Sequence, residues 1–124
     1  MKVIRFHHVS VNANGATLDE VVDFYRDVLG LADRPRPEIP GIAGHWCEVG
    51  DQELHVVGAA PAGTAIDPMG NHYCVTVDDL ESAIAELDRR RIEYRRGMQG
   101  ETLQIWIVDP AGNTIELQQD TTAP

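Results

Sequence analysis

Two stretches of the chain carry hydrophobic residues at the spacing of an amphipathic helix. Within 17–29 and within 79–91 the apolar positions recur at offsets of three and four, which places them on one face of a helix. The first set is Leu18, Val21, Val22, Tyr25, Val28 and Leu29, and the second is Leu80, Ala83, Ile84 and Leu87. The pattern predicts one helix in each stretch.

Both predicted helices have start signals of the same kind. Thr17 and Glu20 have the spacing of a capping box, in which the two side chains satisfy free backbone N–H groups. Asp78 and Glu81 repeat that spacing before the second helix. Gly30 is suited to the left-handed conformation that ends a helix. We therefore expect the first helix to end just before Gly30.

Short runs of strand-type residues surround the two helices. A run precedes each helix and at least two follow it, over 6–11, 46–49 and 53–57 and then over 72–77, 103–108 and 114–118. The proline-containing segment after the first helix, 35–40, is expected to be irregular or to lie at a sheet edge. Each half therefore has the order strand, helix, strands, which is typical of an α+β fold.

The two halves are similar to each other. His8 aligns with His72 at the start of matching runs, and Trp46 aligns with Trp106. We assign a first module to 1–58, a linker to 59–70 and a second module to 71–120. A module of about 60 residues hardly buries a core alone. The chain is therefore expected to form one domain over 1–124.

The net charge of the chain limits the kinds of molecule that it is expected to bind. The 124 residues include 20 acidic and 10 basic ones, a formal charge of -10. This charge repels phosphate backbones and anionic lipid head groups, and no apolar run approaches the roughly 20 residues that span a bilayer. We expect no nucleic acid and no membrane partner. Cys47 and Cys74 fit reduced thiols of a cytoplasmic protein.

Alternation along the strands brings possible metal ligands to one kind of face. The apolar residues Val9, Val11, Val75, Val77, Leu54, Val56, Ile115 and Leu117 mark the sides that meet the helices. The opposite sides carry His8 and His72 on the two first strands, and His55 and Glu116 on the two last strands. Three imidazoles and one carboxylate suit zinc, nickel, iron or manganese. The sequence therefore predicts a divalent metal site, with Glu53 as the alternative ligand to His55.

Other residues are candidates for the walls of a pocket. Ser10 and Cys74 share the faces of the predicted ligands, and the two tryptophans, Trp46 and Trp106, lie on neighbouring runs. Each tryptophan fits either a pocket wall or the core, because a buried indole needs a partner for its N–H. His7 has the wrong parity for the ligand face and is expected to pack at the strand start.

Four motifs resemble the vicinal oxygen chelate superfamily, the family of glyoxalase I, bleomycin resistance proteins and extradiol dioxygenases. They are HVSV (8–11), FYRDVLGL (24–31), GDQELH (50–55) and DPAGNTIE (109–116). The resemblance covers nearly the whole chain. It implies two βαβββ modules whose mixed sheets curl into a cup around a metal, with His8, His55, His72 and Glu116 as ligands, and a homodimer.

The resemblance also implies a choice of chemistry. A glyoxalase-like lyase or isomerase would act on a small α-hydroxycarbonyl or α-keto compound through a metal-stabilised enediolate, with Glu116 moving the proton. An extradiol-type iron dioxygenase would use His8, His72 and Glu116 and keep His55 as an acid or base. A metal-free drug- or metabolite-binding module needs no ligand set. We expect the first of these, with His55 and Glu116 as catalytic candidates.

Overall fold

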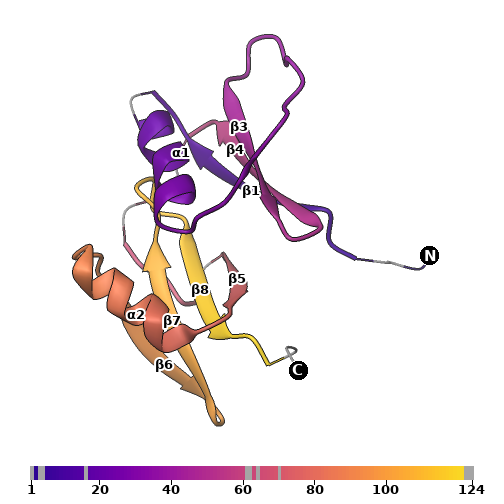
Figure 1. Ribbon diagram of the computed structural model, residues 1–124. Helices are drawn as coiled ribbons and strands as arrows, with labels where there is room; N and C mark the ends of the chain where they lie inside the picture. Colours follow the sequence, from indigo (N-terminus) through magenta and orange to yellow (C-terminus); the bar gives the residue numbers. More distant parts are fainter. Residues whose placement is uncertain are drawn as a thin grey trace. The chain divides into compact units, whose positions relative to one another are not determined.

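The chain folds into two units with the same order of elements, shown in the computed structural model of Figure 1. The structure describes residues 2, 5–15, 17–60, 63, 65–69 and 71–121. Unit 1 is Met1–Gly63 and unit 2 is Thr64–Pro124. Within these described residues, each unit contains one strand, one helix and three further strands. The predicted α+β fold of two βαβββ modules is confirmed.

Unit 1 is a four-stranded mixed sheet with one helix. Its elements are β1 (His8–Ala13), α1 (Thr17–Asp27), β2 (Asp33–Arg34), β3 (Gly44–Val49) and β4 (Gln52–Gly58). The strand order is β1-β4-β3-β2, with β1 parallel to β4 and the other pairs antiparallel. Helix α1 packs on β1, β3 and β4 through its buried side chains, Val21, Val22, Phe24 and Tyr25.

Unit 2 repeats this arrangement. Its elements are β5 (His72–Val77), α2 (Leu80–Arg89), β6 (Arg95–Gln99), β7 (Thr102–Val108) and β8 (Thr114–Gln119). The strand order is β5-β8-β7-β6, and β5 is parallel to β8. Helix α2 packs on β8 and buries Leu80, Ile84 and Leu87. Because the first and last strands of each unit are paired in parallel, residues at the start of both lie side by side.

The helix ends differ in part from the predicted signals. Thr17 does not form a capping box with Glu20: it lies in the first turn of α1, and its hydroxyl donates to the carbonyl oxygen of Asn14. The N-cap of α2 is Asp79 rather than Asp78, since the Asp79 carboxylate accepts from the Ser82 N–H at 3.1 Å. Gly30 has a φ of 66°, as the end of α1 requires.

A buried aspartate shapes the turn that leads into β8. Asp109 is 1% exposed, and its Oδ1 accepts from the backbone N–H groups of Ala111 and Asn113. Its Oδ2 accepts from the Asn113 side-chain amide at 2.8 Å. These bonds close the turn over the segment 109–113 and set where Thr114, the first residue of β8, begins to pair with β5.

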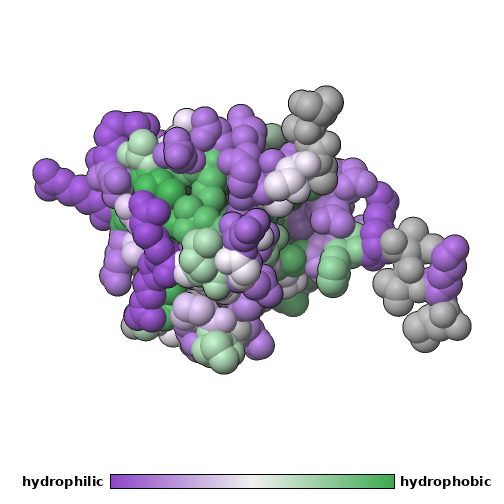
Figure 2. All heavy atoms as spheres, turned by 90° about the horizontal axis from the view of Figure 1, so that it is seen from below, coloured by the Kyte–Doolittle hydropathy of each residue, from purple (hydrophilic) through white to green (hydrophobic). Residues whose placement is uncertain are grey.

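Polar side chains predominate on the face of the molecule in Figure 2. On the face in Figure 2, hydrophilic residues surround a smaller group of apolar ones. The large apolar side chains that are exposed are Phe6, Ile39, Ile42, Met69 and Met98. Cys47 is buried, Cys74 is exposed, and neither is in a disulfide bond. Among the described residues, no helix is long and apolar enough to cross a membrane.

Candidate functional site

In unit 2, four residues form a row across the sheet on one face. Arg95 of β6 pairs with Trp106 of β7, Trp106 pairs with Glu116 of β8, and Glu116 pairs with Cys74 of β5. Directly paired residues point to the same face of a sheet. This face also carries His72, two residues before Cys74 on β5. The register therefore gathers charged, aromatic and metal-ligand side chains from all four strands.

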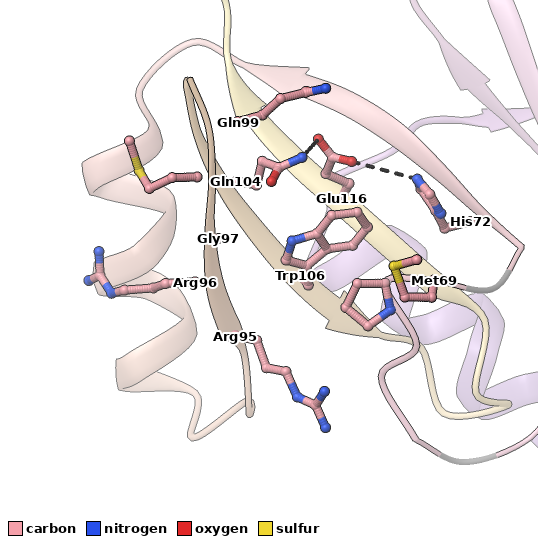
Figure 3. Close-up of a pocket in the computed structure, with 11 residues that line it drawn as sticks. Met69, His72, Arg95, Arg96, Gly97, Gln99, Gln104, Trp106 and Glu116 are labelled. Atoms are coloured by element: carbon pink, nitrogen blue, oxygen red, sulfur yellow. Dashed lines mark hydrogen bonds and ion pairs between the residues drawn. The ribbon is translucent and has the colours of Figure 1, made fainter. Parts of the chain in front are cut away.

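Glu116 is the buried centre of this row. It is 5% exposed, and its Oε1 lies 3.6 Å from His72 Nε2. Its Oε2 accepts from the Gln104 side-chain amide at 3.3 Å and from the Gln118 amide. A carboxylate held by two amides on one oxygen keeps the other oxygen toward the imidazole, as Figure 3 shows.

A hollow of about 560 Å³ opens beside Glu116. The residues that line it are Pro68, Met69, His72, Arg95, Arg96, Gly97, Met98, Gln99, Gln104, Trp106 and Glu116. Gly97 keeps one wall open, because a Cβ there would lie 3.2 Å from Trp106 Nε1 and 3.1 Å from Gln104 Oε1. The volume suits a small molecule.

In unit 1 the residues equivalent to His72 and Glu116 are His8 and His55, and their rings are stacked. The His8 and His55 ring centroids are 4.0 Å apart with planes 16° from parallel, and Trp46 covers the His55 ring at 4.1 Å and 4°. Burial, followed by the neighbouring His55 and His7, lowers the pKa of His8 and favours its neutral form. Neutral imidazole is the form that binds metals.

In unit 1 the Glu53 carboxylate lies between His55 and Arg34 and contacts both. Its Oε1 accepts from His55 Nε2 at 3.0 Å, and its Oε2 lies 3.2 Å from Arg34 Nε. The hydrogen bond from His55 is the main reason that the pKa of Glu53 is lowered. The bond also leaves the lone pair of His55 on Nδ1, the arrangement in which a carboxylate orients a metal-bound histidine.

His7 lies closer to this cluster than its parity predicts. Residue 7 precedes β1, and His7 Nδ1 lies 3.0 Å from His8 Nδ1. The His7 ring also approaches Glu53, with Nε2 3.9 Å from Oε2. Alternation applies only within a strand, and His7 lies just outside one. Because its side chain is 72% exposed, it forms an outer contact of the cluster.

Each unit holds two of the four predicted metal ligands next to each other. Two atoms that bind one ion at about 2.1 Å with tetrahedral geometry lie roughly 3.4 Å apart, and the His72 and Glu116 atoms are 3.6 Å apart. This pair therefore fits a shared ion. In the described ranges, no group of three or more histidine, cysteine or carboxylate side chains is arranged to hold a metal. How the pairs combine remains a prediction.

The predicted pocket residues lie in different places. Trp106 lines the hollow of unit 2 and is edge-on to His72, with ring centroids 4.9 Å apart. Cys74 shares the row of Glu116 but is not among the residues that line the hollow. Burial of its thiol, followed by nearby Glu116, raises the pKa of Cys74 to about 11, so the thiol stays protonated at neutral pH. Ser10 and Trp46 lie in unit 1, where Ser10 pairs with His55.

Several residues of the site were not predicted from the sequence. Arg95, Gln104 and Gln118 surround Glu116 and Trp106, and Arg34 holds Glu53. The alignment of Trp46 with Trp106 contains the missing signal. If the alignment of the two halves is continued to the edge strands, Arg34 aligns with Arg95. In the structure Arg34 pairs with Trp46, and Arg95 pairs with Trp106.

Two βαβββ units, each with a pair of ligand-type residues on its first and last strands, define the class of fold to which the chain belongs. A sequence model described as the Glyoxalase/Bleomycin resistance protein/Dioxygenase superfamily matches residues 5–117. The chain belongs to this superfamily.

Individual relatives agree with this assignment. The chain is 30% identical to "Glyoxylase I 4" of Arabidopsis thaliana over 120 residues, with 90% of this chain and 68% of the relative covered. A glyoxalase family protein from Bacillus anthracis has the same fold, with a TM-score of 0.84, 24% identity and 98% of each chain covered. Lactoylglutathione lyase from Agrobacterium tumefaciens aligns with a TM-score of 0.71 and 22% identity, over 93% of this chain and 92% of that one.

Proposed function

We propose that the protein is a metal-dependent lyase or isomerase of the glyoxalase type that acts on a small α-hydroxycarbonyl or α-keto compound. The observation that carries the proposal is the pair of His72 and Glu116 beside a hollow of about 560 Å³. A buried carboxylate that opens onto such a hollow is suited to moving a proton on a bound substrate.

His8, His55, His72 and Glu116 would hold the metal, two from each unit. When bound, a divalent ion supplies Lewis-acid stabilisation to two neighbouring substrate oxygens. The pair in unit 2 supports this because its ligand atoms have a suitable separation, and the pair in unit 1 because Glu53 orients His55. Zinc, nickel, iron and manganese all accept this mixture of imidazole and carboxylate.

Glu116 would carry the proton. Its carboxylate removes the proton from the carbon that bears the hydroxyl and returns it to the neighbouring carbonyl carbon. The hydroxyl proton passes to the carbonyl oxygen, so that the atoms of substrate and product are the same. Gln104 and Gln118 hold Oε2 in place during this transfer. Trp106, which is 7% exposed, forms an apolar wall that limits water at the reacting carbon.

Metal binding is the first test. Protein purified without chelator is analysed for metals, stripped, and titrated with Zn, Ni, Fe(II) and Mn. We expect His8→Ala and His72→Ala each to weaken metal binding more than about 10-fold, since even outer-shell changes cost that much. His45→Ala supplies a matched control and should change the affinity less than two-fold, because His45 is hydrogen-bonded to Asp33 and not to any of the four ligands. Absence of metal binding by the wild-type protein would contradict the proposal.

Turnover is the second test. The adduct of methylglyoxal with a thiol is offered to the metal-loaded protein, and a product formed by proton transfer supports the glyoxalase type. Cleavage of catechol with Fe(II) and oxygen would instead favour the dioxygenase. A protein that binds small molecules in the hollow without metal would be a binding module.

We further propose that the active form is a homodimer. Each unit has only two of the four ligands, so the stoichiometry of metal per chain and the molar mass in solution are measured together. One ion per chain in a dimer that falls apart when the metal is removed is the expected result. A metal-loaded monomer would contradict this part of the proposal.

A further inference from the structure

Arg95 is a cation of the hollow that has no acidic partner within the described chain. It lines the hollow, yet none of the ion pairs between described residues includes it. Figure 3 shows Arg95 on the same side of the strands as Trp106, whereas Arg96 points away from Trp106. Arg96 instead lies 5.9 Å from the ring of Tyr94.

Unit 1 shows what an arginine at this position binds. Arg34 pairs with Trp46 and Trp46 pairs with His55, as Arg95 pairs with Trp106 and Trp106 with Glu116. The two arginines are therefore equivalent in the repeat. Arg34 reaches across to the last strand of its sheet and holds the Glu53 carboxylate, which also accepts from His55.

Unit 2 lacks that carboxylate. Glu53 pairs with His8 in unit 1, and the residue that pairs with His72 in unit 2 is Thr114. Thr114 carries no charge, and its hydroxyl accepts from the Asp67 N–H at 3.0 Å. The position that carries a carboxylate in unit 1, Glu53 on the last strand, therefore carries an uncharged hydroxyl in unit 2, and no ion pair of the described residues gives Arg95 another acidic partner.

We infer that Arg95 binds the carboxylate of an anionic substrate, which takes the place that Glu53 has in unit 1. This inference rests on the proposed function and narrows it: the substrate is an acid that also carries the α-hydroxycarbonyl group, rather than an uncharged carbonyl compound. In unit 1 one carboxylate contacts both the arginine and the last-strand residue His55. In unit 2 a substrate carboxylate at Arg95 leaves the rest of the substrate to extend along Trp106 toward Glu116, because the three residues follow one another across the sheet. The carbon that bears the hydroxyl then comes within reach of the base.

The chemistry of the guanidinium supports this role. Its planar N–H groups match the two oxygens of a carboxylate, and such charged hydrogen bonds are about twice as strong as neutral ones. The net charge of -10 does not attract anions to the protein as a whole. Binding of an anion in this hollow therefore depends on the local cation, and removal of that one charge has a measurable effect.

Binding is tested on protein stripped of metal, so that the result does not depend on turnover. Pyruvate is titrated into protein labelled with ¹⁵N-arginine, and the side-chain Nε–H resonances are followed. Hydroxyacetone, of similar size but uncharged, is the control ligand. We expect the Arg95 resonance to shift with pyruvate and not with hydroxyacetone.

Variants of two arginines of unit 2 separate this site from a general effect of charge. Arg95→Gln should weaken pyruvate binding at least about 10-fold, as expected for the loss of a charged hydrogen-bonding group. Arg89→Gln removes the same charge from the last turn of α2, outside the lining of the hollow, and should change the affinity less than two-fold. Arg95→Lys keeps the charge without the planar fork and should give an intermediate affinity.

The outcomes distinguish this inference from the proposed function. If pyruvate does not bind, or if both glutamine variants weaken binding equally, Arg95 is not a carboxylate site, whatever the metal titrations give. If Arg95→Gln alone weakens binding while no metal binds, the carboxylate site stands and the metal-dependent reaction fails.

Discussion

The two units use one scaffold for two different arrangements of side chains. In unit 1, Trp46 lies flat on His55 and Arg34 is paired with Glu53, so the face is filled by the chain's own groups. In unit 2, Trp106 is edge-on to His72, Arg95 has no ion pair with a described residue, and a hollow remains. One substitution within the repeat explains much of this difference: unit 1 has a carboxylate at Glu53, and unit 2 has Thr114 at the equivalent position.

The two units also differ in which strand of this face carries a glycine. In unit 1, Gly44 on β3 leaves room for Arg36, whose guanidinium lies 3.3 Å from where a Cβ of Gly44 would be. In unit 2 the corresponding β7 position is Gln104, and the glycine is Gly97 on the edge strand. A missing side chain is thus filled by a neighbour in unit 1 and opens the hollow in unit 2.

The largest difference should appear in turnover. Glu116→Gln keeps the shape of the side chain but cannot accept a proton, so we expect kcat to fall about 100-fold or more. His55→Gln, at the equivalent position of unit 1, should mainly weaken metal binding, so that excess metal restores most of the activity. Steady-state kinetics over a range of metal concentrations separates the two effects. Equal losses of kcat at saturating metal would show that the units share the proton transfer.

Removal of a large core side chain should destabilise the two units to a similar extent. Leu54 and Ile115 are equivalent in the repeat and are 2% and 0% exposed. Leu54→Ala and Ile115→Ala should each lower the free energy of unfolding by about 2–5 kcal/mol. Urea unfolding followed by circular dichroism measures the change. One shifted transition in both variants indicates that the units unfold together, and a second transition indicates that they do not.

The two glycines should give opposite patterns of stability and binding. A Cβ at Gly44 would lie 2.4 Å from the Val56 carbonyl oxygen, so Gly44→Ala must shift the backbone and should cost about 1–3 kcal/mol of unfolding free energy. A Cβ at Gly97 meets only side-chain ends, so Gly97→Ala should cost less and should instead weaken ligand binding in the hollow. Thermal denaturation and ligand titration of both variants test this pattern.

The smallest effect concerns an ion pair that unit 2 does not repeat. Asp33 accepts hydrogen bonds from Arg26 and His45, which lower its pKa to about 2. The unfolded value is near 3.9, so this stabilisation is present above about pH 4 and is lost as the pH falls toward 2. Asp33→Asn should lower the melting temperature slightly at pH 7, because the pair is exposed. The difference from wild type should shrink below pH 4, and a difference independent of pH would contradict this account.

Hydrophobic periodicity was sufficient to predict both helices and the inner strands, but not the edge strands β2 and β6 or the ends of the elements. Both helices and the order of strands follow from the spacing of apolar residues, because burial of one face selects the period. The caps were less predictable, since Thr17 and Asp78 have the right spacing but the backbone begins each helix at a different residue. A cap depends on the path of the chain into the helix, which local spacing does not determine.

The alternation of side chains along each strand was sufficient to predict that the four candidate ligands lie on the faces opposite the helices. It did not predict Arg34 or Arg95. Each arginine lies on an edge strand, and its relation to the tryptophan beside it exists only through sheet pairing between distant segments. Partners across strands depend on register, which the sequence of one strand does not contain.

Periodicity within short segments was enough to predict the α+β class, the internal repeat and the pairs of ligand-type residues. The ion pair of Glu53 with Arg34, and the hollow in which Arg95 has no acidic partner in the described chain, became visible with the folded sheets. This is because a charge is satisfied by whatever lies near it in space. Here the groups that meet come from different strands of a sheet, and their pairing arises only when the sheet forms.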